Sequence, residues 1–146
     1  MERLKMQLSD TFKAMKQEGL VDDHFTFVYS LKKNVEDHFY VEMIPEFCTE
    51  VRDAIKHLTQ IIDDQTLNYS LMKNYVYKIK GSSSSFGACR LAVACADFER
   101  AIDAASKEGC LQALKRIKRE MSALEERLHD CLQIERRIVI LAAEKK

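Results

Sequence analysis

The 146-residue chain has the length of one domain and the composition of a globular protein. Apolar residues make up 47% of it and charged residues 32%, and 23 Lys and Arg balance 23 Asp and Glu. The zero formal charge argues against nucleic acid as a main partner, because phosphate binding usually shows as a basic excess. The chain has no run of about 18 apolar residues, and its charged N-terminus lacks a signal-peptide core, so we expect no membrane span and no secretory leader.

Few residues that break helices are present. One proline and four glycines favour long helices over many-turned β structure. The cysteines are odd in number and never spaced CxxC, which predicts buried free thiols in a reducing compartment. Because Cys and His are not paired at zinc-binding spacing, we expect no metal and no cofactor. The five cysteines are Cys48, Cys89, Cys95, Cys110 and Cys131.

Two helices are predicted at the start of the chain, over about residues 2–33. Apolar residues at helical spacing predict a first helix that ends near Gly19, and Asp22 and Asp23 can cap a shorter second one. The apolar positions are Leu4, Leu8, Phe12 and Met15 in the first helix, and Phe25, Val28 and Leu31 in the second. We expect these helices to cover one end or side of a larger bundle.

Four longer amphipathic helices follow and predict an all-α fold with about six helices in total. Their short connections predict an antiparallel four-helix bundle over about residues 37–137, within a single domain of residues 1–146. The apolar positions are Phe39, Met43, Phe47, Val51, Ile55 and Leu58 in the third helix, Leu67, Leu71, Tyr75, Ile79 and Phe86 in the fourth, Leu91, Cys95, Phe98, Ile102 and Ala105 in the fifth, and Leu114, Ile117, Met121, Leu124, Leu128 and Cys131 in the sixth.

The ends of these helices follow from turn residues. The third helix is expected to begin near Asp37, and Pro45 inside it should kink it or delay its start. Residues 62–66 read as a turn, Gly87 as a break, and Gly109 as the end of the fifth helix. The apolar segment "IVILAA" (138–143) needs burial and is too short for a membrane anchor. We expect it to dock on the N-terminal helices, with a membrane or partner contact as the alternative.

The fourth helix has two different faces. At about 100° per residue, one arc is predicted to face the core: Leu71, Met72, Tyr75, Val76, Ile79, Ser82, Ser83 and Phe86. Tyr77 points away from this arc, with Lys73, Lys80, Gly81 and Ser84 around it at helical spacing. A glycine inside a helix costs about 1 kcal/mol relative to alanine. On an outward face Gly81 gives no packing benefit, but its bare backbone lets another molecule approach closely.

The segment "GSSSS" (81–85) has two other interpretations. A frayed helix segment is one, although Phe86 continues the apolar arc and favours a continuous helix. A phosphate-cradling loop is the other, although no Gly-Lys-Ser/Thr follows and no strand precedes it.

The segment "KGSSSSFGA" (80–88) resembles the signature of plant histidine-containing phosphotransfer proteins, written H-Q-x-K-G-S-S-x-S-x-G. The segments "GLVDDHF" (19–25) and "CADFERA" (95–101) also fall in family-like positions, and the resemblance covers roughly residues 18–137. It implies a helical bundle with a phosphoacceptor histidine on an outer face. It also implies a shuttle of phosphoryl groups from the receiver domain of a hybrid histidine kinase to that of a response regulator, which in plants serves cytokinin signalling.

One departure from the family pattern decides the interpretation. The family's histidine falls on position 77, which is Tyr77 here, and the next position, usually glutamine, is Lys78. Lys80 and Gly81 match, and Ser84 lies within the matching serine run, so the pattern resembles pseudo-phosphotransfer members that lack the histidine. Neutral imidazole offers a nitrogen lone pair, whereas a phenol, with a pKa of about 10, is ionised to only about 1 part in 1,000 at pH 7. A phosphotyrosine ester would also be too stable to return its phosphoryl group to aspartate.

The resemblance therefore implies a binding protein and not an enzyme. We expect it to bind the receiver domains of hybrid histidine kinases and response regulators without accepting phosphate, as an inhibitory decoy or a scaffold. The resemblance assigns receiver binding to Lys73, Tyr77, Lys78, Lys80, Gly81 and Ser84. We expect a monomer that acts in the cytoplasm and nucleus.

Two alternatives stay open. One is a working carrier with a non-standard acceptor, although the four histidines all lie outside the motif and are expected to be structural or solvated: His24, His38, His57 and His129. The other is a helical adapter unrelated to phosphorelay, for which an outward glycine flanked by lysines would have no purpose.

Overall fold

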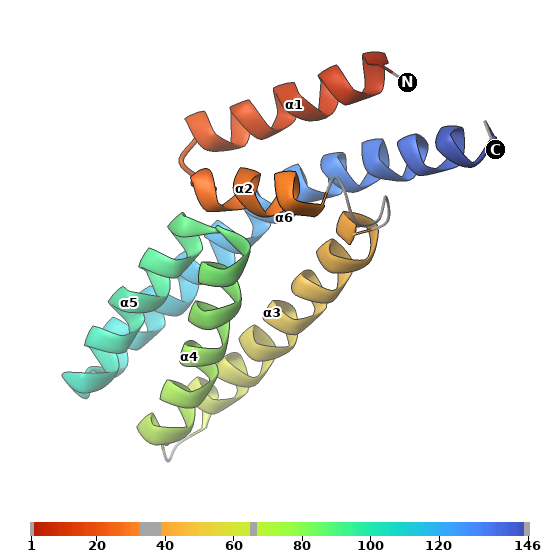
Figure 1. Cartoon of the computed structure of the whole chain (residues 1–146). Helices are drawn as coiled ribbons and strands as arrows, with labels where there is room; N and C mark the ends of the chain where they lie inside the picture. Colours follow the sequence, from red (N-terminus) through yellow and green to blue (C-terminus); the bar gives the residue numbers. More distant parts are fainter. Residues whose placement is uncertain (1, 33–38, 65–66, 145–146) are drawn as a thin grey trace.

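The computed structural model describes residues 2–32, 39–64 and 67–144, and these residues form six α-helices without a strand. The helices are α1 (Glu2–Gln17), α2 (Asp23–Lys32), α3 (Phe39–Asp63), α4 (Tyr69–Phe86), α5 (Cys89–Asp103) and α6 (Lys107–Glu144). Figure 1 shows α3, α4, α5 and the first half of α6 as a four-helix bundle. In the same view α1 and α2 lie at one end, and α1 runs beside the second half of α6. The predicted all-α bundle is confirmed.

Side chains cap the helices where the sequence indicated turns. The Asp22 carboxylate accepts a hydrogen bond from the backbone N–H of His24 at 3.0 Å, which confirms the predicted cap of α2. At the start of α4, the Asn68 side chain accepts from the backbone N–H of Leu71 at 3.0 Å. Each cap satisfies a backbone donor that has no partner inside its own helix.

Gly87 ends α4 and holds the corner between α4 and α5 against α2. Its φ of 87° lies in the left-handed region that glycine adopts readily. A Cβ at this position would lie 2.5 Å from the backbone nitrogen of Phe25. The backbone N–H of Asp22 donates to the Gly87 carbonyl at 3.0 Å. Both the dihedral angle and the close approach therefore require glycine here.

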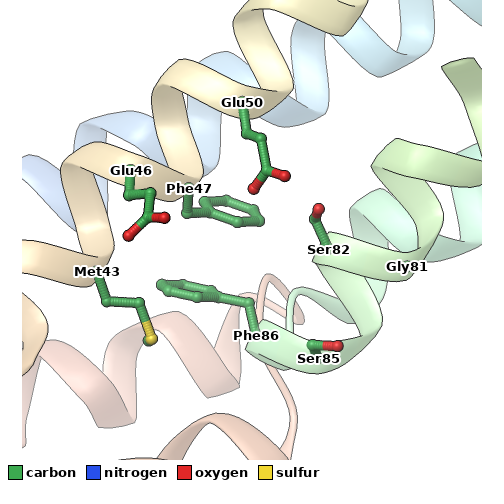
Figure 2. A pocket seen from close by; sticks show the side chains of 8 residues that line it. All are labelled: Met43, Glu46, Phe47, Glu50, Gly81, Ser82, Ser85 and Phe86. Carbon is green, nitrogen blue, oxygen red and sulfur yellow. The ribbon is translucent and has the colours of Figure 1, made fainter.

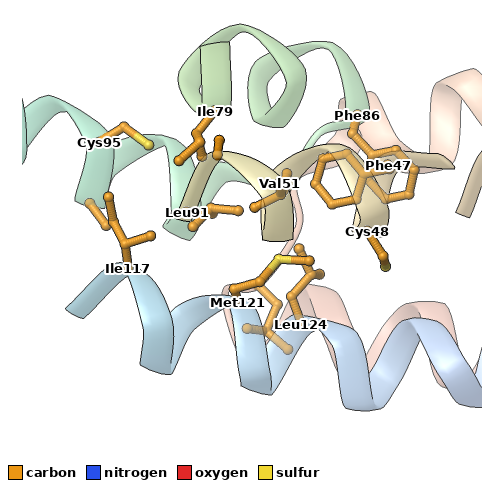
Figure 3. Close-up of a cluster of buried hydrophobic side chains, with 14 of the residues drawn as sticks. Phe47, Cys48, Val51, Ile79, Phe86, Leu91, Cys95, Ile117, Met121 and Leu124 are labelled. Atoms are coloured by element: carbon orange, nitrogen blue, oxygen red, sulfur yellow. The ribbon is translucent and has the colours of Figure 1, made fainter. Parts of the chain in front are cut away.

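The four bundle helices share one apolar core (Figure 3). The predicted positions of the first, fifth and sixth helices are mostly buried, and so are five residues of α4. The buried residues of α4 are Met72, Val76, Ile79, Ser83 and Phe86. Those of α6 are Cys110, Ala113, Leu114, Ile117, Met121, Leu124, Leu128, Cys131, Leu132 and Glu135.

The predicted core arc of α4 was too wide. Leu71 is 40% exposed, and Tyr75 and Ser82 are half-buried instead of buried. Helical periodicity gives the direction of the buried face, but the positions of α3 and α5 decide how far around α4 that face extends. Ser82 therefore lines the edge of the bundle and not its core.

The predicted boundary between the fifth and sixth helices was wrong. The structure ends α5 at Asp103, and Ala105 lies in the turn with a φ of 50°. The hydroxyl of Ser106 accepts a hydrogen bond from the backbone N–H of Gly109 at 2.9 Å, so Ser106 caps α6 and Gly109 lies in its first turn. Pro45 does not delay α3, which begins at Phe39.

The expected start at Asp37 and the residue His38 lie outside the described residues, as do the side chains of Val28, Leu31 and Phe39. The segment 138–143 continues α6: Ile138 packs against the core, while Ile140 is 57% exposed. Docking of this segment is thus only partial. In the described part of the chain, no helix is long and apolar enough to cross a bilayer.

Candidate functional site

Tyr77 lies in the middle of the exposed face of α4. Its side chain is 52% exposed, whereas the neighbouring Val76 and Ile79 are 0% and 1% exposed. The helix runs without a break from Tyr69 to Phe86, so the frayed-segment interpretation is wrong. The predicted outward direction of Tyr77 is confirmed. The serine run is helical, and its one buried hydroxyl, that of Ser83, donates to the carbonyl of Ile79 at 2.6 Å.

Gly81 lies one turn after Tyr77 on the same face. A Cβ added to it would meet no heavy atom within 4 Å beyond its chain neighbours and the helix's own nearby backbone. The fold therefore does not require glycine at this position, in contrast to Gly87. Ser84 is exposed as well. We call the predicted binding residues together the candidate surface: Lys73, Tyr77, Lys78, Lys80, Gly81 and Ser84.

Two lysines of the candidate surface are bound to acidic residues of α5. Lys73 Nζ donates to Asp103 Oδ1 at 2.9 Å, and Lys80 Nζ lies 3.1 Å from Glu99 Oε1. The hydrogen bond to Asp103, supported by the charge of that carboxylate, raises the pKa of Lys73. Lys73 Nζ is also 6.0 Å from the centre of the Tyr77 ring, a cation–π distance. On this flank of Tyr77 the lysine charges are therefore compensated inside the molecule.

The two acidic partners were not found from the sequence. Glu99 and Asp103 are four residues apart, so they lie on one face of α5, and this spacing was the available signal. Their pairing with α4 depends on the register of two antiparallel helices, which a single sequence does not show.

Lys78 lies on the opposite flank of the candidate surface. At about 100° per residue it is a quarter-turn or so from Tyr77, on the side of Ser82 and Ser85. It is exposed and forms no ion pair with any residue that the structure describes. The structure thus groups Lys73, Tyr77 and Lys80 toward α5 and places Lys78 toward α3.

A groove of about 440 Å³ runs between α3 and α4 beside the candidate surface (Figure 2). The rings of Phe47 and Phe86 stack at its base, with centroids 4.3 Å apart and an interplanar angle of 10°. Four residues of each helix line it: Met43, Glu46, Phe47 and Glu50 of α3, and Gly81, Ser82, Ser85 and Phe86 of α4. Sequence reasoning missed this groove, because it exists only where the two helices meet.

The described histidines lie off the exposed face that holds Tyr77. His24 Nε2 is hydrogen-bonded to the carbonyl of Ser85 at 3.1 Å, and His129 Nε2 lies 3.0 Å from Gln133 Nε2. His57 on α3 stacks on the ring of Tyr75 with centroids 4.9 Å apart. All three belong to other surfaces of the bundle.

The cysteines are free, as predicted, and four of them are buried. Burial is the main cause that raises the pKa of Cys48 to about 11 and those of Cys95 and Cys131 to about 12. These thiols remain protonated at neutral pH. Within the described ranges, no three His, Cys, Asp or Glu side chains are placed to hold a metal ion together.

Comparison with known proteins agrees with this geometry. The Hpt domain family matches residues 42–127, more than half of the chain. The chain is 30% identical over 138 residues to histidine-containing phosphotransfer protein 2 of Arabidopsis thaliana, covering 94% of this chain and 88% of that protein. Pseudo histidine-containing phosphotransfer protein 6 of Arabidopsis thaliana is 23% identical over 142 residues, with 97% and 92% covered.

Solved structures agree as well. The crystal structure of a histidine-containing phosphotransfer protein from maize superimposes with a TM-score of 0.88 at 28% identity, covering 92% of this chain and 99% of that one. The residues that match the Hpt domain family, 42–127, include all of α4. Sequence and fold together show that the chain belongs to the Hpt domain family, the histidine-containing phosphotransfer proteins.

Proposed function

We propose that the chain is a pseudo histidine-containing phosphotransfer protein of a plant multistep phosphorelay in cytokinin signalling. It binds receiver domains of hybrid histidine kinases and response regulators without accepting a phosphoryl group. As a monomer in the cytoplasm and nucleus, it acts as a decoy that lowers phosphoryl flow, or as a scaffold. The observation that carries this proposal is an exposed Tyr77 where the family signature places histidine.

The surroundings of Tyr77 support the absence of phosphoryl transfer. A phenol needs an adjacent base to become a nucleophile. Among the described residues, none is hydrogen-bonded to the Tyr77 hydroxyl. The nearby Lys73 is paired with Asp103 and has a raised pKa, so it is a cation and not a base. An imidazole at the same position would carry a lone pair at neutral pH without such help.

The same helix face supports binding. Gly81 leaves the backbone open to a partner, and Tyr77 presents a large ring with a polar hydroxyl, a combination common at interfaces. The family resemblance supplies a receiver domain with an acidic phosphorylation pocket as the partner. Lys78, which forms no ion pair with a described residue, complements such a pocket.

The Tyr77→His variant tests the proposal. We expect the variant to accept a phosphoryl group from a phosphorylated receiver domain, and the original chain to bind the same receiver without becoming labelled. Acid-labile phosphate is measured by radiolabelling, and binding by calorimetry. Tyr75→His is the matched control, because it places an imidazole two residues away on a half-buried position facing α3.

Two results would contradict the proposal. Labile phosphate that passes through the original chain to a response regulator would show a working carrier. Absence of binding to receivers that bind true carriers would remove the decoy or scaffold role.

A second candidate function, a carrier with a non-standard acceptor, is favoured by one observation at His57. Its Nδ1 donates to the carbonyl of Asp53 at 2.7 Å, since a carbonyl oxygen only accepts. In the neutral ring the lone pair then lies on Nε2, and the side chain is exposed. If the original chain takes labile phosphate, His57→Gln should abolish it. If the chain is a decoy, neither the original chain nor His57→Gln should carry acid-labile phosphate.

A further inference from the structure

The groove between α3 and α4 has the shape and charge of a site for a basic side chain. We propose that it accepts an arginine or lysine of the docked receiver domain, whose cationic head binds Glu46 and Glu50. This inference rests on the proposed function, because the receiver is its partner. It adds a second contact, on the α3 flank, to the candidate surface around Tyr77.

The base of the groove is aromatic. Phe47 and Phe86 are 5% and 4% exposed, and Figure 2 shows their stacked rings between α3 and α4. Met43 continues this apolar lining on α3. Such a base suits the aliphatic stem of a long side chain, and aromatic rings also attract cations.

Two carboxylates form the α3 wall. Glu46 and Glu50 are exposed and four residues apart on α3, and Figure 2 shows their side chains on either side of Phe47. Neither forms an ion pair with a residue in the described part of the chain. This distinguishes them from Glu99 and Asp103 on the α5 flank, whose charges are already matched by lysines. Lys78 of α4 is the one cation of the candidate surface on this side, but it does not line the groove, so the two carboxylates of the α3 wall favour a cationic occupant there.

Small residues form the α4 wall of the groove, and one of them, Gly81, also belongs to the candidate surface. The wall consists of Gly81, Ser82 and Ser85, whose side chains are small or absent. Four residues advance a helix by about 400°, so Gly81 lies roughly 40° around α4 from Tyr77. A partner that covers Tyr77 can therefore pass a side chain across Gly81 into the groove.

Arginine fits this lining especially well. Its planar guanidinium can stack on an aromatic ring and donate to two carboxylates, whereas an acidic side chain would be repelled by them. Among the described residues, carboxylates without an ion pair lie on the α3 flank of Tyr77 and not on the α5 flank, so the groove also fixes the orientation in which a receiver docks. It would discriminate between receivers with and without a basic residue at the facing position.

The double variant Glu46→Gln/Glu50→Gln tests the inference by removing both charges at almost unchanged shape. We expect its affinity for a receiver that binds the original chain to fall at least about tenfold, or roughly 1.4 kcal/mol. The salt dependence of binding should become weaker. The control is Glu126→Gln/Asp130→Asn, which removes two exposed charges at the same spacing on α6, away from the groove. Its affinity should stay within about twofold of the original.

Three outcomes decide the inference. A groove variant that binds within twofold of the original, or a control that loses as much affinity as the groove variant, overturns it. If no receiver binds even the original chain, the proposed function and the receiver assignment both fail.

The groove itself is then tested separately, by titrating N-acetyl-arginine amide and following the backbone amide signals by NMR. Shifts at Gly81, Ser82 and Ser85 that disappear in the groove variant support a cation site, and their absence overturns it.

Discussion

The two faces of α4 differ in what determines their residues. On the inner face Met72, Val76 and Ile79 are at most 1% exposed, and each fills space between neighbouring helices. On the outer face Tyr77 is 52% exposed, and a Cβ at Gly81 would touch nothing. Packing accounts for the first set and gives no reason for the second.

This contrast separates residues required for the fold from candidates for function. An exposed tyrosine and a glycine inside a helix both reduce stability or leave it unchanged, so packing does not account for them and they become candidates for binding. The glycines at 81 and 87 show the difference most clearly, since both belong to one serine-rich segment. One has open space around it, and the other lies against the backbone of Phe25.

The largest effect on stability is expected for Gly87→Ala. Its Cβ would lie 2.5 Å from the backbone nitrogen of Phe25, at a φ of 87° that alanine adopts only with strain. We expect the free energy of unfolding to fall by roughly 3 kcal/mol, measured by urea denaturation. A loss below about 0.5 kcal/mol would show that the corner between α2 and α4 adapts easily.

The second-largest effect on stability is expected at alkaline pH, where ionisation of a buried thiol should lower the free energy of unfolding. Burial raises the pKa of Cys95 from its ordinary value of 9.0 to about 12. The protonated thiol therefore contributes its full stabilisation below about pH 9, and this contribution is lost as the pH rises toward 12. Between these two pKa values, one such thiol lowers the free energy of unfolding by about 1.4 kcal/mol for each pH unit. We expect Cys95→Ala to lose stability less steeply than the original chain between pH 9 and 11. If the free energy of unfolding falls equally steeply with pH in both proteins, ionisation of Cys95 does not cause the alkaline loss of stability.

Gly81→Ala should have the opposite sign to Gly87→Ala. We expect the free energy of unfolding to rise by about 0.5 to 1 kcal/mol, because alanine is the better helix former and its methyl group meets no other atom. A larger side chain, Gly81→Leu, should keep the fold intact but weaken receiver binding about tenfold by blocking the approach to the backbone. Unchanged receiver binding in Gly81→Leu would remove Gly81 from the interface.

The smallest effect is expected for the acidic residues of α5. Glu99→Gln/Asp103→Asn releases Lys73 and Lys80 from their ion pairs, which should change the free energy of unfolding by less than about 1 kcal/mol. The freed lysines should raise receiver affinity roughly threefold, and more at low salt, as calorimetry at two ionic strengths would show. A lower affinity would mean that the ion pairs position the lysines for binding.

Much of the fold and part of the candidate site could be predicted from the sequence. Apolar spacing gave the helices, Gly87 gave the end of α4, and the angle around α4 gave an exposed Tyr77 beside Gly81. These features depend on residues within one helix, whose geometry is nearly the same in every protein. The errors at Leu71 and at the α5–α6 turn came from effects between helices and from the Ser106 cap.

By itself, then, the sequence determined the helices, their apolar faces and the outward position of Tyr77, because local periodicity and the absence of breakers decide them. Only the tertiary structure decided that Asp103 and Glu99 hold Lys73 and Lys80, and that Glu46 and Glu50 line a groove with Phe47 and Phe86 without an ion pair to any described residue. Those relations join residues on different helices. They depend on the register and distance at which the helices pack, which the shape of the whole core sets.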